Sequence, residues 1–151
     1  TSDIYLTHYN MIFFVPRTMP NVNLVDAGWL PYSLYRSGSD IVEKYVAELF
    51  KRMGYKTRTT KASGDYGVDV IAKNKEETIA IQVKKYKDSP VGNKEVQRLL
   101  GSMQMKKIQA DRSILITTSR FTKNAINQAD GCPIQLWDGK DLAKMIKKYN
   151  S

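Results

Sequence analysis

Three polar side chains interrupt two apolar stretches near the middle of the chain, and their types suit phosphodiester chemistry. Asp69 stands within the first apolar run, Val68–Ala72. Gln82 lies in the second run, Thr78–Val83, and Lys84 directly follows it. A carboxylate within an apolar run is costly unless a cation or a donor meets it. Carboxylate and amide oxygens suit Mg²⁺, and a neighbouring lysine can orient or deprotonate an attacking water.

The two apolar runs predict a β-hairpin that would bring these side chains together. Both are rich in β-branched residues, and the polar segment 73–77 joins them. Period-two alternation places Gln82 and Lys84 on the same face of the second strand. If strand pairing sets Asp69 beside them, its carboxylate meets an amide, an ammonium and the backbone carbonyl of Val83. This arrangement predicts metal-assisted hydrolysis of a phosphodiester bond.

Four segments resemble a known nuclease family. They are GDYGVDVIA at 64–72, IQVKKY at 81–86, VG at 91–92 and SILITTSRFTKNA at 113–125. They are similar to the Mrr-type restriction endonuclease domain, a branch of the PD-(D/E)XK nuclease superfamily, and the resemblance extends from about Ser37 to Lys148. The general motif of the superfamily has an acidic residue where this chain has Gln82, and glutamine at that position is characteristic of the Mrr branch.

The resemblance implies a metal-dependent DNA endonuclease of the Mrr-like restriction type. Asp69 and Gln82, with the carbonyl of Val83, would hold Mg²⁺, for which Mn²⁺ could substitute. Lys84 would assist the attack of water on the scissile phosphate. Because Gln82 supplies no negative charge, metal binding should be weaker than in an acidic version of the motif.

Two residues on predicted helices have an ordinary structural explanation as well as a catalytic one. Glu43 matches a glutamate that reaches toward the metal in this family, but the pair Asp40 and Glu43 also has the spacing of a helix capping box. Gln97 matches a helix from which a polar residue approaches the active site in related nucleases. For Gln97, we expect a plain surface position.

Charge favours nucleic acid as the partner. The chain has 24 lysines and arginines against 15 acids, a net charge of +9. Residues 1–39 hold two bases and two acids, so the whole excess belongs to the remainder. Basic domains attract polyanions such as DNA. Basic residues near the predicted site would contact the phosphate backbone, or form a solvated strand end. They are Lys85, Lys87, Lys61 and Arg58.

Hydrophobic periodicity predicts the elements that would position the site. Helices are expected at 40–53, 93–107, 122–129 and 140–149, and further strands at 55–60, 113–118 and 134–137. The resulting order is helix, three strands, helix, strand, helix, strand, helix. It predicts an α/β fold in which helices flank a mixed β-sheet. The nuclease resemblance implies the same restriction-endonuclease-like order.

The composition changes at about residue 39, which predicts an aromatic-rich N-terminal arm at 1–39 and an Mrr-like nuclease domain at 40–151. The arm holds seven of the fifteen aromatic residues and one predicted strand, Met11–Val15. We expect it to pack on the domain or to pair with a second subunit, giving a homodimer that could cut both DNA strands. Because the sequence starts at Thr1 without methionine, part of the natural protein is expected to be missing.

Other function classes lack their signatures. The single cysteine, Cys132, excludes an internal disulfide and favours a cytoplasmic location, and it should pack as a small apolar residue. No apolar run approaches membrane-span length, so no membrane association is expected. A Holliday-junction resolvase-like nuclease is a rival, although that family usually has an acid where Gln82 stands. A second rival is a non-catalytic nucleic-acid-binding module that retains the nuclease fold.

Overall fold

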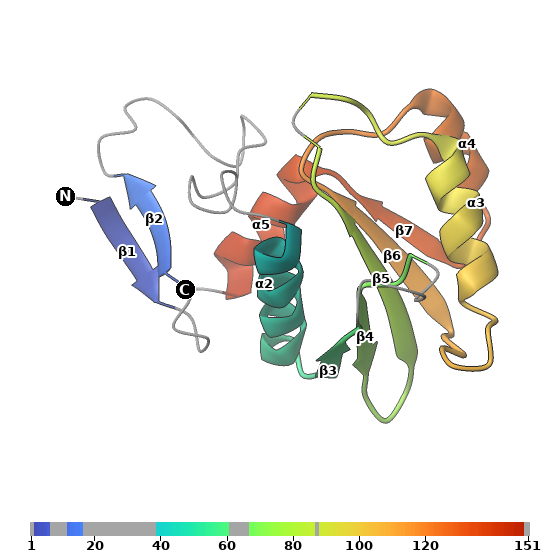
Figure 1. Ribbon diagram of the computed structural model, residues 1–151, viewed down its shortest axis with the longest axis horizontal. Helices are drawn as coiled ribbons and strands as arrows, with labels where there is room; N and C mark the ends of the chain where they lie inside the picture. The colour runs from blue at the N-terminus through green and yellow to red at the C-terminus, as the bar shows by residue number, and fades with distance from the viewer. Residues whose placement is uncertain (1, 7–11, 17–38, 61–66, 87, 150–151) are drawn as a thin grey trace.

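The fold is built around a five-stranded mixed β-sheet with two helices on each face (Figure 1). The computed structural model describes residues 2–6, 12–16, 39–60, 67–86 and 88–149, with side chains from residue 41 onward. The strands of this sheet are β3 (Lys56–Thr59), β4 (Val70–Lys73), β5 (Thr78–Lys84), β6 (Arg112–Thr117) and β7 (Ile134–Trp137). The helices are α2 (Ser39–Arg52), α3 (Asn93–Ser102), α4 (Lys123–Ala129) and α5 (Gly139–Tyr149).

The sheet begins as an antiparallel meander and continues through helical crossovers. Strand β4 pairs antiparallel with both β3 and β5, whereas β6 pairs parallel with β5 and β7 pairs parallel with β6. The spatial order of the strands is therefore their order in the sequence. The predicted fold class and element order are confirmed, as is the β4–β5 hairpin with the register Lys73 opposite Thr78.

Helices α2 and α5 cover one face of the sheet. The centre of the apolar stripe expected on α2 is buried, with exposed fractions between 0% and 2%, and only its two end residues, Ile41 and Met53, are half-buried. The buried residues are Val42, Tyr45, Val46, Leu49 and Phe50. They pack on the β5 residues Ile79, Ile81 and Val83. Burying each large apolar side chain contributes about 1.5–3 kcal/mol, so this layer fixes the direction of β5. Gly54, at a φ of 104°, ends the helix as predicted.

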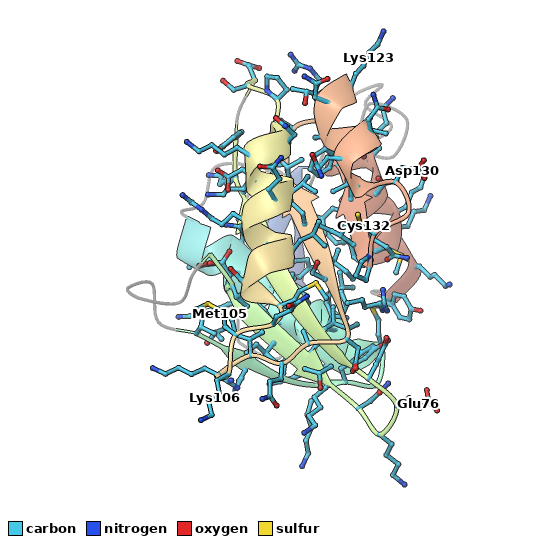
Figure 2. The ribbon with its side chains drawn as sticks, turned by 90° about the vertical axis from the view of Figure 1, so that its right-hand side faces the viewer. Glu76, Met105, Lys106, Lys123, Asp130 and Cys132 are labelled. Carbon is cyan, nitrogen blue, oxygen red and sulfur yellow. The ribbon has the colours of Figure 1, made fainter. Side chains whose placement is uncertain are left out.

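Helices α3 and α4 cover the opposite face, as Figure 2 shows with these two helices side by side in front of the sheet. Val96 and Leu99 of α3 pack with Ala80 of β5 and Leu115 of β6. Cys132 is half-buried against this core, which confirms its prediction as a packing residue. In Figure 2, Glu76 in the β4–β5 hairpin and Lys123 at the start of α4 lie at opposite ends of the molecule.

The hairpin end of the sheet is held by a group that we name the Glu77 clamp: Tyr55, Glu77 and Arg112. Arg112 donates from Nε to Glu77 Oε1 over 2.7 Å and from Nη2 to Oε2 over 2.9 Å. The Tyr55 hydroxyl donates to Oε2 over 2.6 Å. These donors, Arg112 first, lower the pKa of Glu77 to about 2. Burial, followed by the hydrogen bond to Glu77, raises the pKa of Tyr55.

Two parts of the chain differ from the sequence prediction. Helix α3 ends at Ser102 instead of Lys107, because the residues that follow form a loop held by backbone hydrogen bonds. The N–H of Ile108 donates to Met105 O, and the N–H of Ala110 donates to Met103 O. Gln109 completes this loop at a φ of 45°. The N-terminal segment contains two strands instead of one. They are β1 (Ser2–Leu6) and β2 (Ile12–Pro16), which pair antiparallel in a sheet of their own.

Within the described ranges, none of the helices combines the length and apolar character needed to cross a membrane.

Candidate active site

Asp69 lies at the start of β4, beside the end of β5. Its backbone N–H donates to Ile81 O over 2.8 Å, which extends the strand pairing by one residue. Its side-chain Oδ2 accepts from the backbone N–H of Val83 over 2.7 Å. The predicted approach of Asp69 to the second strand is therefore present. The carboxylate is half-buried and held at the point where the β4–β5 ladder stops.

The Val83 peptide gives this point a second oxygen. In an extended strand, the N–H and C=O of one residue point toward the same neighbouring strand. Because the N–H of Val83 donates to the Asp69 side chain, the carbonyl of Val83 also points toward the β4 side. The Asp69 carboxylate and the Val83 carbonyl, two of the three oxygen ligands expected from the sequence, thus lie toward the same end of β4.

Gln82 is buried on the α3 side of the sheet. Its side chain is 3% exposed, and its Oε1 has no hydrogen-bond partner. A buried acceptor without a donor costs about 1–3 kcal/mol. The fold therefore keeps an amide oxygen at this position without using it to stabilise itself.

Gly67 makes room for the Gln82 amide. Its φ of 84° lies in the region that favours glycine, and a Cβ built on it would come within 2.9 Å of Gln82 Nε2. The same Cβ would lie 3.4 Å from Cδ of Arg98 on α3. Any side chain at residue 67 would therefore displace the amide. A glycine ahead of Asp69 is expected from the turn alone, whereas its close contact with Gln82 has no signal in the local sequence.

Lys84 ends β5 on the same face as Gln82, as the alternation predicted. Its Nζ lies 3.5 Å from Oε2 of Glu95, a residue in the first turn of α3. The two side chains are 24% and 18% exposed, so the pair is largely buried. We name Asp69, Gln82, Val83 and Lys84 the β5 site, and Glu95 is the acidic side chain that α3 brings to it.

The remaining predicted site residues lie on the helices that cover the two faces of the sheet. Glu43 is half-buried near the start of α2, which covers the opposite face of the sheet from Gln82 and Lys84. Helix α2 begins toward the end of the sheet where β5 ends (Figure 1). The role of Glu43 at the metal stays a prediction. Gln97 is exposed and donates to Gln128 Oε1 over 3.1 Å, so its predicted surface position is confirmed.

Of the four residues predicted to contact DNA, two lie within the described residues and two lie outside them. Lys61 and Lys87 lie outside the described residues. Lys85 is half-buried directly after β5, whereas Arg58 is exposed on the edge strand β3. Arg58 lines a hollow of about 650 Å³ between β3 and α2, together with Lys44 and Lys51. The hollow therefore has three cationic residues in its lining, of which the sequence analysis had singled out Arg58 alone.

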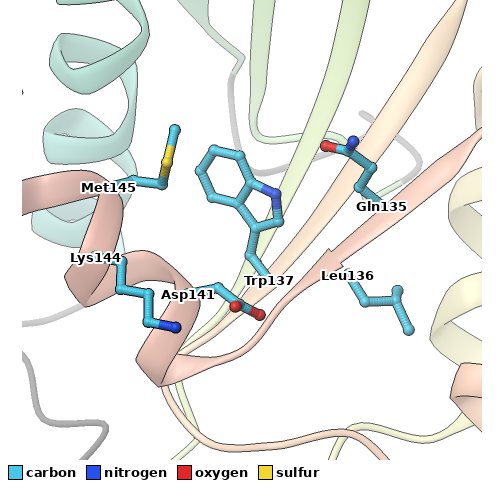
Figure 3. A pocket seen from close by; sticks show the side chains of 6 residues that line it. All are labelled: Gln135, Leu136, Trp137, Asp141, Lys144 and Met145. Carbon is cyan, nitrogen blue, oxygen red and sulfur yellow. The ribbon is translucent and has the colours of Figure 1, made fainter. Parts of the chain in front are cut away.

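A second hollow, of about 530 Å³, lies between the other edge strand, β7, and α5 (Figure 3). Trp137 and Asp141 line it, but both have structural roles. The rings of Trp137 and Phe50 stack with their centroids 5.5 Å apart. Asp141 Oδ2 accepts from the backbone N–H of Asp138 at the start of α5. Burial raises the pKa of Asp141. Strand β6 lies between β5 and the strand that lines this hollow.

The residues of the β5 site fit a divalent cation of the Mg²⁺ type. Among the described residues, no group of three or more His, Cys, Asp and Glu side chains gathers, which argues against a dense cage of charged ligands. The Asp69 carboxylate accepts from the N–H of Val83, the residue that follows Gln82 in β5, and Gln82 Oε1 has lone pairs that accept no hydrogen bond. Mg²⁺ is commonly bound through one or two carboxylates, with water and substrate phosphate completing its shell.

Comparison with known proteins places this geometry in a family. The model of the restriction endonuclease family Mrr_cat matches residues 37–146, which is most of the chain and includes every residue of the β5 site. The chain belongs to this family. The resemblance to an Mrr-type domain inferred from the sequence is confirmed. A search of curated protein sequences finds no significant match.

Solved structures share the fold of this Mrr-type chain. The DNA modification-dependent restriction endonuclease AspBHI superposes with a TM-score of 0.64 at 20% identity, over 85% of this chain and 35% of that one. MspJI restriction endonuclease, in complex with a 27-mer oligonucleotide, gives 0.54 at 21% identity, over 77% and 29%. A repair endonuclease from Pyrococcus abyssi gives 0.51 at 16% identity, over 69% and 47%. The chain thus spans about a third of the first two proteins.

Proposed function

We propose that this Mrr-type domain is a metal-dependent DNA endonuclease that hydrolyses phosphodiester bonds. The strongest support is the junction at the end of β5, where the Asp69 carboxylate is fixed on the Val83 N–H next to a buried amide and a lysine. Family membership supports the same activity, because the matching family is one of restriction endonucleases.

Each residue of the β5 site has a task in this proposal. Asp69, Gln82 and the Val83 carbonyl would hold Mg²⁺, or Mn²⁺ in its place. A bound divalent metal would polarise the scissile phosphate and make water a better nucleophile. Lys84 would donate to a phosphate oxygen and orient the attacking water. Because the surroundings are largely buried, the charge of Lys84 acts there with little screening by solvent.

DNA would reach the site along the basic surface of the domain. The cationic hollow between β3 and α2 lies at the edge of the sheet that is two strands from β5. Lys44, Lys51 and Arg58 would contact phosphates there, while Lys85 lies directly after the site. MspJI was crystallised with an oligonucleotide, and its shared fold is consistent with DNA as the substrate class.

Cutting both strands of a duplex would require two copies of this single site. We propose that the N-terminal strands β1 and β2 take part in such a homodimer. Their antiparallel pairing leaves one outer edge on each strand, and such edges can add further strands from a second copy.

The test is cleavage of supercoiled and linear DNA by the purified chain with Mg²⁺, with Mn²⁺ or with EDTA. Asp69→Asn is the sharpest variant, because an asparagine oxygen can still accept from the Val83 N–H. Lys84→Met removes the ammonium. Each should slow cutting by about 10²- to 10⁴-fold without unfolding the domain. The exposed hairpin variant Glu76→Gln is the control and should cut at the native rate.

Two outcomes would contradict the proposed activity. Metal-independent cutting that survives Asp69→Asn would remove the β5 site from the chemistry. DNA binding without any cleavage would favour a non-catalytic nucleic-acid-binding module, in which the neutral Gln82 ligand holds the metal too weakly for catalysis.

A further inference from the structure

Glu95 is an acidic side chain at the β5 site, and one of its carboxylate oxygens is buried without a hydrogen-bond partner. It lies in the first turn of α3, where the N-cap residue Gly92 supplies no side-chain hydrogen bond. Negative charge near a helix N-terminus is stabilising, but only by about 0.3–1 kcal/mol when it is exposed to solvent. Glu95 is instead 18% exposed and directed at the end of β5. Burial of a carboxylate is costly, so a partner for it is expected.

The ion pair with Lys84 satisfies the charge of Glu95 but not its lone pairs. The distance from Lys84 Nζ to Glu95 Oε2 is 3.5 Å, and Oε2 is buried without a hydrogen-bond partner. Charge-assisted hydrogen bonds of this type are normally about 2.7–2.9 Å long. The contact is therefore a loose one, in which the carboxylate keeps its capacity to accept a second cation.

A second orphaned oxygen belongs to the same face of the sheet. Gln82 Oε1 is also buried without a donor, and Gln82 alternates with Lys84 on the side that α3 covers. The next turn of α3 approaches the same place, since Arg98 Cδ lies near the Gly67 position that borders the Gln82 amide. One helix thus brings Glu95 to the end of β5 and closes the space around Gln82.

The charges of the site indicate what these two oxygens would accept. Asp69 contributes one negative charge, Lys84 contributes one positive charge, and Gln82 contributes none. Without Glu95, the charges of Asp69, Gln82 and Lys84 sum to zero, so the side chains on the β4–β5 hairpin alone offer a divalent cation no net attraction. With Glu95, the sum is negative, and two carboxylates are available, a number typical of protein Mg²⁺ sites.

We propose that Glu95 is the second carboxylate of the metal site, supplying from α3 the charge that Gln82 does not supply from β5. This inference rests on the proposed metal-dependent function. The metal ligands would then come from the β4–β5 hairpin and from helix α3, which packs over it. Glu95 would then hold the metal together with Asp69, while Lys84, at 3.5 Å from Glu95, would remain available to a phosphate oxygen.

The test is calorimetric titration of Mn²⁺ into the folded chain, so that the readout is binding and not cleavage. Glu95→Gln removes the charge at nearly constant shape and should weaken Mn²⁺ binding by about 10- to 100-fold. The double variant Gln82→Glu with Glu95→Gln moves the carboxylate to β5. It should recover the native affinity to within about threefold, because the site again holds two carboxylates. Glu76→Gln, an equal loss of charge at the distant hairpin, should leave the affinity unchanged.

The outcomes separate this inference from the function it rests on. Native Mn²⁺ affinity in Glu95→Gln, or no recovery in the double variant, would overturn the role of Glu95 while leaving the nuclease intact. Absence of Asp69-dependent Mn²⁺ binding in the native chain would instead overturn the metal-dependent function itself. If Glu95→Gln does not fold, Glu95→Asp provides the test, since it keeps the ion-pairing charge but withdraws it by one methylene. Weaker Mn²⁺ binding in that variant supports the inference, and unchanged binding contradicts it.

Discussion

Strand β5 begins beside the Glu77 carboxylate and ends beside the Gln82 amide, and the two groups differ in how completely they are hydrogen-bonded. Both oxygens of Glu77 accept from Arg112, and one also accepts from the Tyr55 hydroxyl. At the other end, Gln82 Oε1 and Glu95 Oε2 are buried and accept no hydrogen bond. The fold therefore supplies hydrogen-bond donors to the Glu77 carboxylate but none to the two buried oxygens at the other end of β5.

The difference separates a structural polar cluster from a functional one. The Glu77 clamp joins β5 and β6 to the segment that follows α2, and each oxygen of its carboxylate accepts at least one hydrogen bond from the protein. The β5 site fixes Asp69 through the Val83 N–H but leaves the neighbouring oxygens without donors. Unused acceptors cost stability, and binding a cation would recover that cost.

The largest combined effect on stability and on Mn²⁺ affinity is expected from Gly67→Ala. The substitution places a Cβ within 2.9 Å of Gln82 Nε2 at a φ of 84°. We expect a loss of unfolding free energy of about 1–2 kcal/mol from the backbone alone, plus weaker Mn²⁺ binding as the amide is displaced. Denaturant unfolding and Mn²⁺ titration measure the two effects.

A matched control exists at Gly54. Its φ of 104° imposes a similar backbone penalty, but a Cβ there would meet nothing within 4 Å. Gly54→Ala should therefore lower stability without changing Mn²⁺ affinity. Equal effects of the two variants on Mn²⁺ binding would show that Gly67 is a turn residue only.

Glu77→Gln should affect stability alone. It removes the charge-assisted hydrogen bonds from Arg112 in a group that is about one quarter exposed. Allowing for solvent screening, we expect a loss of about 1–2 kcal/mol in the free energy of unfolding. Mn²⁺ affinity and DNA cleavage should remain native. Loss of cleavage in a folded Glu77→Gln chain would contradict the separation of the two clusters.

The same clamp predicts a dependence of stability on acid. Because the folded pKa of Glu77 is about 2, below its ordinary value of 4.5, its contribution is present above pH 4.5. It should be lost progressively as the pH falls from 4.5 toward 2. Urea unfolding across this range should show a shallower acid decline in Glu77→Gln than in the native chain. Parallel curves for the two proteins would be inconsistent with the clamp.

The smallest effect on stability is expected from Gln82→Met. Methionine is apolar and of similar length, and it removes the orphaned acceptor. The free energy of unfolding should stay constant or rise by up to about 1 kcal/mol, while Mn²⁺ binding weakens. Thermal unfolding and Mn²⁺ titration measure the two. A strongly destabilised Gln82→Met would mean that the amide serves the fold.

Local patterns were sufficient to predict the strand pairing and the side-chain alternation at the β5 site, whereas the catalytic roles of its residues came from the family resemblance and stay a prediction. The alternation of β5, with Ile81 toward α2 and Gln82 toward α3, follows from strand geometry, and the short connection after Lys73 sets the pairing that brings Asp69 to Val83. Helix α2 was predicted because its stripe repeats with a helical period and a glycine ends it. These features depend on residues close in the sequence.

The contacts that were missed join distant segments or depend on exact geometry. Glu95 meets Lys84 because α3 packs across β5 after a loop, and nothing near Glu95 in the sequence reports that contact. Arg112 lies 35 residues from Glu77, so the clamp has no local signature. The early end of α3 depends on a loop in which Gln109 adopts a positive φ. Because residues other than glycine rarely adopt this conformation, a glutamine in the sequence does not predict it.

The most direct test of the account is to locate Mn²⁺ on the chain by paramagnetic broadening of its ¹H–¹⁵N NMR spectrum. The account predicts that substoichiometric Mn²⁺ first broadens the backbone signals of Asp69 and Val83 and the side-chain amide of Gln82. The signals of Glu77 and Arg112 should remain sharp, and Asp69→Asn should abolish the selective loss. Broadening centred on the Glu77 clamp, or spread evenly over the acidic surface, would contradict a metal site at the end of β5.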